Sequence, residues 1–567
     1  MDRIEFLHGG AALQYGPQPG GALNYITHRP REDKEFSIRS QHVIGSDNLY
    51  STFSSADGTV GKLGYYTYFN HRQADGFRST NSDYDLYNGA VKLLYSFDNG
   101  GKLIFNVDSY RETHGEPGGL TAEAFSDGNL DATRLFDELT IERDSVSLTY
   151  EIAPNSDSFF TATTWWSDYL RFSHRQRGGG FGALPTGADS GTDSVERQEF
   201  HTFGTDARYR MNWGFAGDKP HTISTGAQFY YSDAPRRDSR GLTPDASSGV
   251  LTNQISRETF YLPVFVENRF SFGNFSITPS VRLENVWQNI DEEKNNTVDN
   301  SGAITATNPL ESINEYNAVL LGGIGAEYEV AKSSAVYANI SQAYRPKIYT
   351  EAVPTSPTAF VNGDLDEGES IEYEIGFRTG AFEWLTADIS VFLLEFKNQV
   401  GTVAVTGGTS FENVGDARHT GVDTALNADI LALMNGKASE QSLNLFLNMT
   451  LLNAEFTDGP NEGNTPQYAP DHIIRTGINY SHEKYGKVSF SGTMVDDHFA
   501  DDTNTEPFAI PAYMVWDLTA EYEFHKNVRL IAGINNLFDE SYYSRVRGDG
   551  IDPSSGRNYY IGASFEF

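Results

Sequence analysis

The sequence predicts an all-β protein, a transmembrane antiparallel β-barrel of about 22 strands. Three observations support this fold class: strands in which apolar and polar residues alternate, short turns that alternate with long polar loops, and an aromatic-rich composition. The 567 residues include 37 Phe, 31 Tyr and 6 Trp, together with 54 Gly and no Cys. Such usage is typical of a barrel with many turns and aromatic belts at the membrane interfaces.

The alternation is clear in the stretch from Trp516 to Phe524, where every second residue is apolar and the residues between are Asp, Thr, Glu and Glu. The same pattern recurs from Ile371 to Arg378, from Ile474 to Tyr480 and from Tyr559 to Phe567. A strand of a soluble sandwich would show this split too. However, charges on the inner face of strand after strand need a wet interior, which favours a large barrel.

Turn lengths give the second indication. Short turns follow Phe97, Ala153 and Phe272, whereas the connections between them are long and polar. Short turns on one rim and long loops on the other are typical of transmembrane barrels, and counting from Glu35 gives about 22 strands. The expected long loops are 113–140, 175–196, 232–258, 288–315, 345–370, 398–418, 456–471, 497–512 and 541–556.

Charge and composition exclude several function classes. The chain has 42 basic and 77 acidic residues, a net charge of −35, which argues against nucleic-acid binding. An acidic surface would instead suit divalent cations that bridge to anionic lipid. There is no Cys, no HExxH motif and no Ser/His/Asp set that can be placed on one rim, so we expect no protein-bound metal, no cofactor and no enzyme activity.

The chain opens with two short apolar strands, Ile4 to Leu7 and Ala22 to Thr27, joined by a turn rich in Gly and Pro. This stretch closely resembles the end of the plug domain in TonB-dependent outer-membrane receptors, where an apolar strand is followed by Arg-Gly-Pro, Leu-Tyr-Gly, Gly-Gly and an Asn-hydrophobic-Ile-Thr strand. The variant here, Tyr15-Gly16-Pro17-Gln18, is most similar to the ferric citrate branch. We therefore expect residues 1–31 to be the C-terminal remnant of a plug and residues 32–567 to be the barrel.

The C-terminus resembles the same family. The run from Asn535 to Tyr543 and the pair Gly556-Arg557 match its C-terminal motif. The terminal Phe567 resembles the aromatic residue that the barrel assembly machinery reads in outer-membrane proteins. The resemblance covers essentially the whole chain, and it implies a monomer in the bacterial outer membrane, in contact with lipid and lipopolysaccharide.

The resemblance further implies import of a ferric chelate, ferric citrate first and another siderophore second, with the iron carried as cargo. Haem, cobalamin or a sugar stays open as the ligand. The chain begins inside the plug, so we expect the segment that contacts the TonB complex upstream of Met1. If the plug were truly absent, the chain would be a passive pore. A third possibility is a surface receptor for phage, toxin or host ligand.

Clustered arginines in two expected loops are candidate ligand contacts. Guanidinium groups bind carboxylates in a planar fork, which suits a citrate-like anion bound to iron. The alternative is that these arginines neutralise nearby acids or lipid phosphate. On the plug turn, Gln14 and Gln18 are candidate hydrogen-bond donors. The loop candidates are Arg175, Arg177, Arg236, Arg237 and Arg240.

A contact between plug and barrel is also expected. In the family, barrel carboxylates at positions matching Glu374 and Asp423 pair with plug arginines, one of them in the Arg-Gly-Pro step. That step is His8-Gly9-Gly10 here. The hypothesis is a weaker latch of His8, Glu374 and Asp423 that responds to pH, because a histidine with a pKa near 6.5 is only partly charged at neutral pH. The alternative is that all three are solvated lumen residues.

Overall fold

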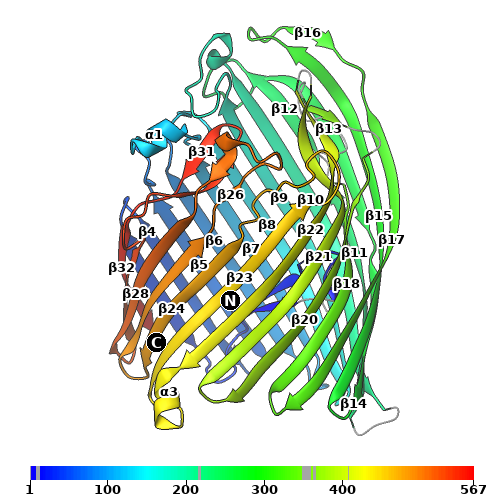
Figure 1. Cartoon of the computed structure of the whole chain (residues 1–567), viewed down its shortest axis with the longest axis vertical. Coiled ribbons are helices and arrows are strands. Elements are labelled where there is room, and N and C mark those ends of the chain that lie inside the picture. Colours follow the sequence, from blue (N-terminus) through cyan, green and yellow to red (C-terminus); the bar gives the residue numbers. More distant parts are fainter. Residues whose placement is uncertain are drawn as a thin grey trace.

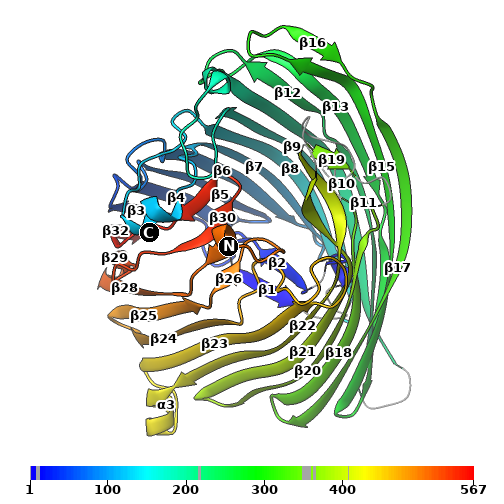
Figure 2. The same ribbon diagram turned by 45° about the horizontal axis from the view of Figure 1, so that its top comes forward.

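A computed structural model describes residues 2–7, 13–18, 20–214, 219–347, 359–361, 365–405 and 408–567, and its main feature is one closed β-barrel (Figure 1). A two-stranded sheet of β1 (Arg3–Leu7) and β2 (Ala22–Ile26) lies within the ring of barrel strands (Figure 2). At the long-loop rim, β26 (His498–Phe499) pairs with β27 (Ala509–Ile510), and β30 (Tyr543–Arg547) pairs with β31 (Gly550–Pro553).

The barrel strands follow one another around the wall in antiparallel pairs, except that the short strand β19 pairs in parallel with β22. Short helices interrupt them at α1 (Ala122–Ser126) and α3 (Ile430–Asn435). The strands are β3 (Ser37–Gly45), β4 (Tyr50–Val60), β5 (Leu63–Ala74), β6 (Tyr84–Ser96), β7 (Lys102–Gly115), β8 (Glu138–Asn155), β9 (Ser158–Gln176), β10 (Asp193–Trp213), β11 (His221–Asp233), β12 (Arg236–Gly241), β13 (Val250–Tyr261), β14 (Val264–Phe272), β15 (Phe275–Val298), β16 (Ile304–Thr307), β17 (Ser312–Ala331), β18 (Ser334–Arg345), β19 (Ala359–Val361), β20 (Gly368–Phe382), β21 (Leu385–Val405), β22 (Gly408–Asp429), β23 (Gln441–Phe456), β24 (His472–His482), β25 (Gly486–Val495), β28 (Tyr513–His525), β29 (Val528–Asn535) and β32 (Asn558–Glu566).

The strand count differs from the expected one. β11 and β12 both pair with β10 and together form one wall strand, as β13 and β14 do against β15. With each of these counted once, the described barrel has 24 strands, so the expectation of about 22 was too low. The additional strands are β16 and β19, which have 4 and 3 residues at the long-loop rim. Strands this short show no period-2 pattern that a sequence reading could detect.

The first and last wall strands close the barrel. β3 pairs with β32 from Arg39 opposite Glu566 to Gly45 opposite Tyr560. Past the end of this ladder, Ile38 and Phe567 exchange two backbone hydrogen bonds of 3.0 and 2.9 Å. Closure leaves no strand edge, as a barrel surrounded by lipid requires. The C-terminal aromatic residue is therefore part of the seam.

A row of aromatic side chains crosses the outer face of the barrel perpendicular to the strands, from β9 to β17. Each member is the direct register partner of the next, and all are half-buried or exposed on a surface that no other part of the described chain covers. Aromatic side chains on the outer face of a membrane barrel gather near the interfaces between the apolar band and water, and this row is called the aromatic girdle. Its members are Trp166 on β9, Phe203 on β10, Tyr231 on β11, Phe260 on β13, Trp287 on β15 and Tyr316 on β17.

The two rims differ as expected. One rim carries tight connections, such as the two-residue turn Gly273-Asn274, in which Gly273 has a φ of 59°. The opposite rim carries long excursions, several of which continue the strand pairing. β15 extends to Val298, and most of the expected loop 398–418 belongs to the paired strands β21 and β22. The extra height comes from hairpins that stay hydrogen-bonded beyond the apolar band.

Among the described residues, no helix combines the length and the apolar character needed to cross a membrane.

A small apolar core lies at the long-loop rim. Ile510, Tyr543, Val546 and Ile551 are between 0% and 8% exposed and pack against Phe125 and neighbouring side chains. This core attaches the β30–β31 hairpin to the loop before β28 and to helix α1. The rim loops are therefore packed together rather than independent of one another.

Replacing Ile551 by Ala should loosen this hairpin. Removing the buried side chain should cost about 2–5 kcal/mol, which corresponds to local opening at least about 25-fold more frequent. Hydrogen exchange of residues 543–551 in the detergent-solubilised protein measures this. The control is Ile561→Ala on the outer face of β32, where Ile561 is 60% exposed. Equal effects of the two substitutions on the hairpin would contradict the packing described.

Candidate functional site

The N-terminal segment is held against the inner wall of the barrel at two places. β1 and β2 pair with each other from Arg3 opposite Ile26 to Leu7 opposite Ala22, and the described part of the chain gives them no further strand partner. Attachment of this segment to the barrel therefore depends on the residues on either side of the two strands. These residues form two sets of contacts, one before β2 and one after it.

The first set of contacts lies at the turn before β2. The guanidinium of Arg282 on β15 donates to the carbonyl oxygen of Leu13 at 2.9 Å and also bonds the carboxylate of Glu284. Both charged side chains are almost completely buried, with residue exposures of 2% and 1%. The backbone N–H of Tyr344 on β18 donates to the carbonyl of Pro17 at 2.8 Å. The turn is thus bonded through its own backbone.

The candidate plug-turn residues lie differently from one another. Gln14 donates from Nε2 to Oε1 of Glu267 on β14 at 3.1 Å, so its amide is engaged with the barrel wall. Gln18 is exposed. Between them, the ring of Tyr15 lies 4.4 Å from the guanidinium carbon of Arg208. Within the described part of the turn, the exposed amide side chain is therefore that of Gln18, whereas Gln14 bonds to the wall.

The second set of contacts follows β2. Arg29 makes a bidentate pair with Glu151 on β8, with distances of 2.7 and 3.0 Å. The ammonium of Lys92 on β6 donates to the Thr27 hydroxyl and to the His28 carbonyl, both at 2.7 Å. Between β2 and the wall strands β4 to β9 remains a cavity of about 770 Å³. The segment lies beside open space in the lumen rather than filling it.

The expected latch lies partly outside the described residues, because His8 is not among them. Glu374 accepts hydrogen bonds from Asn339 at 3.0 Å and from Tyr337 at 3.3 Å. Asp423 accepts one from Thr450. Both carboxylates therefore bond to neighbouring wall strands. The sequence did not predict the hydrogen bond from Arg282 to the carbonyl oxygen of Leu13. Arg282 lies on a strand whose only recognisable pattern is the alternation of apolar and polar residues.

The candidate loop arginines fall into two groups. Arg177 and Arg240 meet at one side chain, since the Oδ1 atom of Asn300 accepts from Arg240 at 2.9 Å and from Arg177 at 3.5 Å. One carboxylate, Asp189, lies 3.6 Å from Arg177 and accepts from Asn300 at 2.7 Å. Burial, followed by the positive charge of Arg177, lowers the pKa of Arg240. Asp189 and Asp299 both act against this shift, so the two guanidinium groups face two carboxylates.

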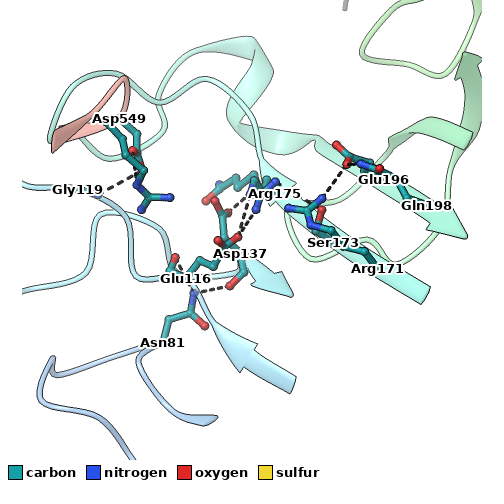
Figure 3. Close-up of polar contacts among 12 residues, drawn as sticks. Asn81, Glu116, Gly119, Asp137, Arg171, Ser173, Arg175, Glu196, Gln198 and Asp549 are labelled. Atoms are coloured by element: carbon teal, nitrogen blue, oxygen red, sulfur yellow. Dashed lines mark hydrogen bonds and ion pairs between the residues drawn. The ribbon is translucent and has the colours of Figure 1, made fainter. Parts of the chain in front are cut away.

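Arg175 and Arg236 have carboxylate partners of their own. Arg175 donates twice to Oε2 of Glu116, at 2.6 and 2.8 Å (Figure 3). Arg236 is 8% exposed and bonds both Glu196 and Asp238. The contacts of Arg175 and Arg236 therefore agree with the alternative to ligand binding, in which the loop arginines neutralise nearby acids.

Strand alternation separates Arg237 from the other candidates. Thr161 and Thr163 on β9 line the lumen cavity, and Arg175 has the same parity along β9. The register from β9 through β10 to β12 places Arg240 on this inner face. Arg237 has the opposite parity, so it lies on the outer face of the barrel and does not join a lumen site.

A pocket of about 420 Å³ opens at the same rim, beneath the β30–β31 hairpin. Arg545 and Arg547 line it, with His114 and Glu112 from β7. Arg547 pairs with Asp552 at 3.0 Å, and His114 lies 2.9 Å from Glu112. The sequence analysis did not identify these residues as candidates. The only indication in the sequence was a pair of arginines separated by one residue, Arg545 and Arg547, in the expected loop 541–556.

A buried carboxylate, that of Asp137, bonds to the backbone next to Arg175. Asp137, just before β8, is 5% exposed and accepts from the backbone N–H of Gln176 at 2.8 Å (Figure 3). Burial raises the pKa of Asp137 to about 6. Because the pKa of Asp137 in the folded protein lies above the usual aspartate value of 3.8, the stabilisation from the protonated form is complete below pH 3.8 and is lost as the pH rises through about 6.

This rim should accordingly be more stable at mildly acidic than at neutral pH. We expect hydrogen exchange of residues 175–177 to accelerate between pH 4 and pH 6.5, after correction for intrinsic exchange, and to level off above that. Asp137→Asn keeps the acceptor oxygen and carries no charge, so the acceleration should vanish in this variant. If hydrogen exchange in Asp137→Asn keeps the same pH dependence, then a group other than Asp137 causes the acceleration.

Substitution of Arg282 should release the turn that it holds. Arg282→Met leaves the buried carboxylate of Glu284 unpaired, at a cost of about 3–5 kcal/mol. Hydrogen exchange at Tyr15 and Gly16 should rise by at least about 100-fold. Because the barrel itself could be weakened, the variant Arg282→Met/Glu284→Gln, which removes the charge as well, serves as the control. It should restore barrel stability and leave the turn released; a turn that stays protected in both would contradict the assignment.

Comparisons with known proteins agree with this architecture. A family model described as "TonB dependent receptor-like, beta-barrel" matches residues 14–537. The metal-pseudopaline receptor CntO of Pseudomonas aeruginosa is 22% identical over 626 aligned residues, which cover all of this chain and 80% of that receptor. The probable TonB-dependent siderophore receptor PiuA of Acinetobacter baumannii is 23% identical over 398 residues, covering 65% of this chain and 50% of PiuA.

Among solved structures, the ferric citrate transporter FecA in its unliganded form superposes with a TM-score of 0.81 at 21% identity, covering all of this chain and 84% of FecA. At that identity the likeness concerns the fold. The match of the family model, by contrast, extends over most of the sequence. The chain therefore belongs to the TonB-dependent receptor β-barrel family of the Gram-negative outer membrane, and it is a receptor rather than an enzyme.

Proposed function

We propose that this receptor binds and imports an anionic metal chelate, with ferric citrate as the first candidate and another siderophore as the second. The named relatives support the class of ligand, since they are receptors for metal-pseudopaline and for siderophores. The resemblance of the turn Tyr15-Gly16-Pro17-Gln18 to the ferric citrate branch supports the first candidate. The iron in such a chelate is cargo, and no covalent chemistry on the protein is required.

The observation that carries the proposal is the pair of Arg177 and Arg240. Two guanidinium groups converge at Asn300, with Asp189 beside Arg177 and with Asp299 also acting on Arg240. The cluster thus places two guanidinium groups together in a chain whose net charge is −35. A chelate with free carboxylates supplies the planar acceptors that guanidinium groups bind most strongly. Arg175 can join if Glu116 gives up its bonds.

Transport would then proceed from the rim to the lumen. The arginine cluster captures the chelate, and the N-terminal segment, held through Leu13, Pro17 and Arg29, lies on the route inward. We propose that residues 1–31 are the end of a plug that the TonB complex moves, with His8, Glu374 and Asp423 as further contacts between plug and barrel. Gln18 is the proposed plug-turn donor to the ligand. The same proposal includes Phe567 as the signal for the barrel assembly machinery and lipopolysaccharide as a neighbour.

The binding site is tested by equilibrium titration of the purified receptor with ferric citrate. Arg177→Gln/Arg240→Gln should weaken binding by at least 100-fold, because each charge-assisted hydrogen bond contributes about 1.5–3 kcal/mol. Arg237→Gln is the matched control, since it removes an arginine of the outer face three residues from Arg240. Its affinity for ferric citrate should equal that of the unaltered receptor.

Two results would contradict the proposal. Equal losses in the double variant and in Arg237→Gln would show that total charge, not the cluster, governs binding. Tight binding of a neutral hydroxamate chelate that is unaffected by the double variant would remove carboxylate recognition from the mechanism.

A further inference from the structure

We propose that the pocket beneath the β30–β31 hairpin binds a metal chelate that has an open coordination position, and that the imidazole of His114 fills this position through Nε2. The assignment rests on the proposed function for the class of cargo, a metal chelate, and adds to it a second site and the coordination state of the metal. The metal remains cargo, because most of its ligands come from the chelator.

A carboxylate fixes the orientation of the His114 ring. The Nδ1 atom of His114 lies 2.9 Å from Oε1 of Glu112, two residues away on β7. The other oxygen of Glu112 accepts a hydrogen bond from the hydroxyl of Tyr110. An ionised carboxylate can only accept hydrogen bonds, so Nδ1 carries the hydrogen and Nε2 of the neutral ring keeps its lone pair. Histidine metal ligands are oriented by a carboxylate in the same manner.

The nitrogen with the lone pair can be reached from the lumen. Nε2 of His114 has no hydrogen-bond partner among the residues that the structure describes. His114 has the same parity along β7 as Ile104 and Asn106, which line the lumen cavity, so it lies on the inner face of the wall. Its side chain is 27% exposed and lines the pocket of about 420 Å³. That volume lies in the range of small-ligand sites, roughly 300–1,000 Å³.

A buried arginine supplies positive charge to the wall of the pocket. Arg78 lines the pocket and is only 5% exposed. In the described part of the chain no carboxylate lies within ion-pair distance of Arg78, so its charge is not neutralised by direct contact. Its guanidinium instead donates to backbone carbonyl oxygens, those of Gly118, Leu130 and Asp131.

The other charged groups of the lining come from the hairpin and from the start of the loop after β7. Arg545 and Arg547 both pair with Asp552, at 3.3 and 3.0 Å, and Arg547 also lies 3.5 Å from Asp549. Glu116 is held by Arg175, as described above. The pocket therefore presents guanidinium groups, which bind the carboxylate arms of a chelator, on the same side of the lumen as the free imidazole nitrogen.

The composition of the pocket indicates a chelate rather than a bare ion. Among the described residues, no group of three or more His, Asp or Glu side chains is placed to hold a metal ion. The chelator must therefore supply most of the ligands, while the imidazole replaces a water molecule on the metal. A neutral imidazole suits iron, nickel, copper and zinc. A chelator that fills every coordination position of its metal cannot use His114.

The test uses copper(II) nitrilotriacetate, which has carboxylate arms and an open coordination position, and follows its binding to the purified receptor by electron paramagnetic resonance. We expect an imidazole nitrogen bound to the copper at saturation. Glu112→Gln should weaken binding by about 10–100-fold, the usual effect of losing the carboxylate behind a histidine ligand. His114→Gln should remove the nitrogen signal and weaken binding at least as strongly.

The matched control is His201→Gln. His201 shares the parity of Phe203 on β10, so it lies on the outer face, and its Nδ1 atom is 2.9 Å from Asp168. It thus has the same pairing with a carboxylate but no arginine-lined pocket, and its loss should leave the affinity for the copper chelate unchanged. Hydrogen exchange of residues 543–551 should be unaltered in all three variants, which shows that the hairpin above the pocket is intact.

A second chelate separates metal coordination from simple anion binding. Cobalt(III) ethylenediaminetetraacetate is an anion whose metal has no open coordination position. It should bind to the unaltered receptor and to His114→Gln with equal affinity.

Three outcomes would overturn the proposal. The first is equal binding of copper(II) nitrilotriacetate to the receptor and to His114→Gln, or a saturated complex without a nitrogen signal. The second is an equal loss of affinity in His201→Gln. The third is binding of the cobalt complex that His114→Gln weakens as much as it weakens binding of the copper complex. The ferric citrate titration of Arg177 and Arg240 uses other residues and another chelate, so failure of either proposal is recognised separately.

Discussion

The structure depends on the pairing of its first and last wall strands, β3 and β32. Every backbone N–H and C=O in an apolar surrounding needs a partner, and a sheet can provide one for each group only if it closes. The seam has seven register pairs between Arg39 and Gly45, continued by the two hydrogen bonds of Ile38 and Phe567. All other features, including the lumen and the rim, follow from a wall without edges.

Closure makes the two faces of every strand different, and this difference organises the function. Outward positions carry the aromatic girdle and Arg237. Inward positions carry charged side chains that bond one another or the N-terminal segment. The buried Arg282 illustrates the inner face, because a charge that would be costly in lipid here binds the carbonyl of Leu13 and the carboxylate of Glu284. The same alternation thus separates membrane contacts from transport contacts.

The sequence predicted the barrel because alternation in segments such as 516–524 reports which residues face lipid and which face the lumen. It did not predict β16 and β19, which are too short to show a period, nor the strand pairing that continues through much of 398–418. Arg236 and Arg237 show the same limit. The sequence analysis places both in one loop and expects both to contact the ligand. In the structure they are consecutive residues of β12, so their side chains lie on opposite faces of the barrel wall. The contact of Arg282 with Leu13 joins residues 269 positions apart, which no local pattern reveals.

The proposed function requires that the rim arginines Arg177 and Arg240 bind an anionic metal chelate at the entrance to the lumen. The most direct measurement is diffraction at the iron absorption edge from crystals of the receptor grown with ferric citrate. We expect an anomalous peak on the inner face of the barrel, with the citrate oxygens in hydrogen-bond contact with Arg177 and Arg240. An ordered iron peak located elsewhere would contradict this proposal. So would tight binding of ferric citrate in a solution titration when crystals grown with the same ligand show no peak at Arg177 and Arg240.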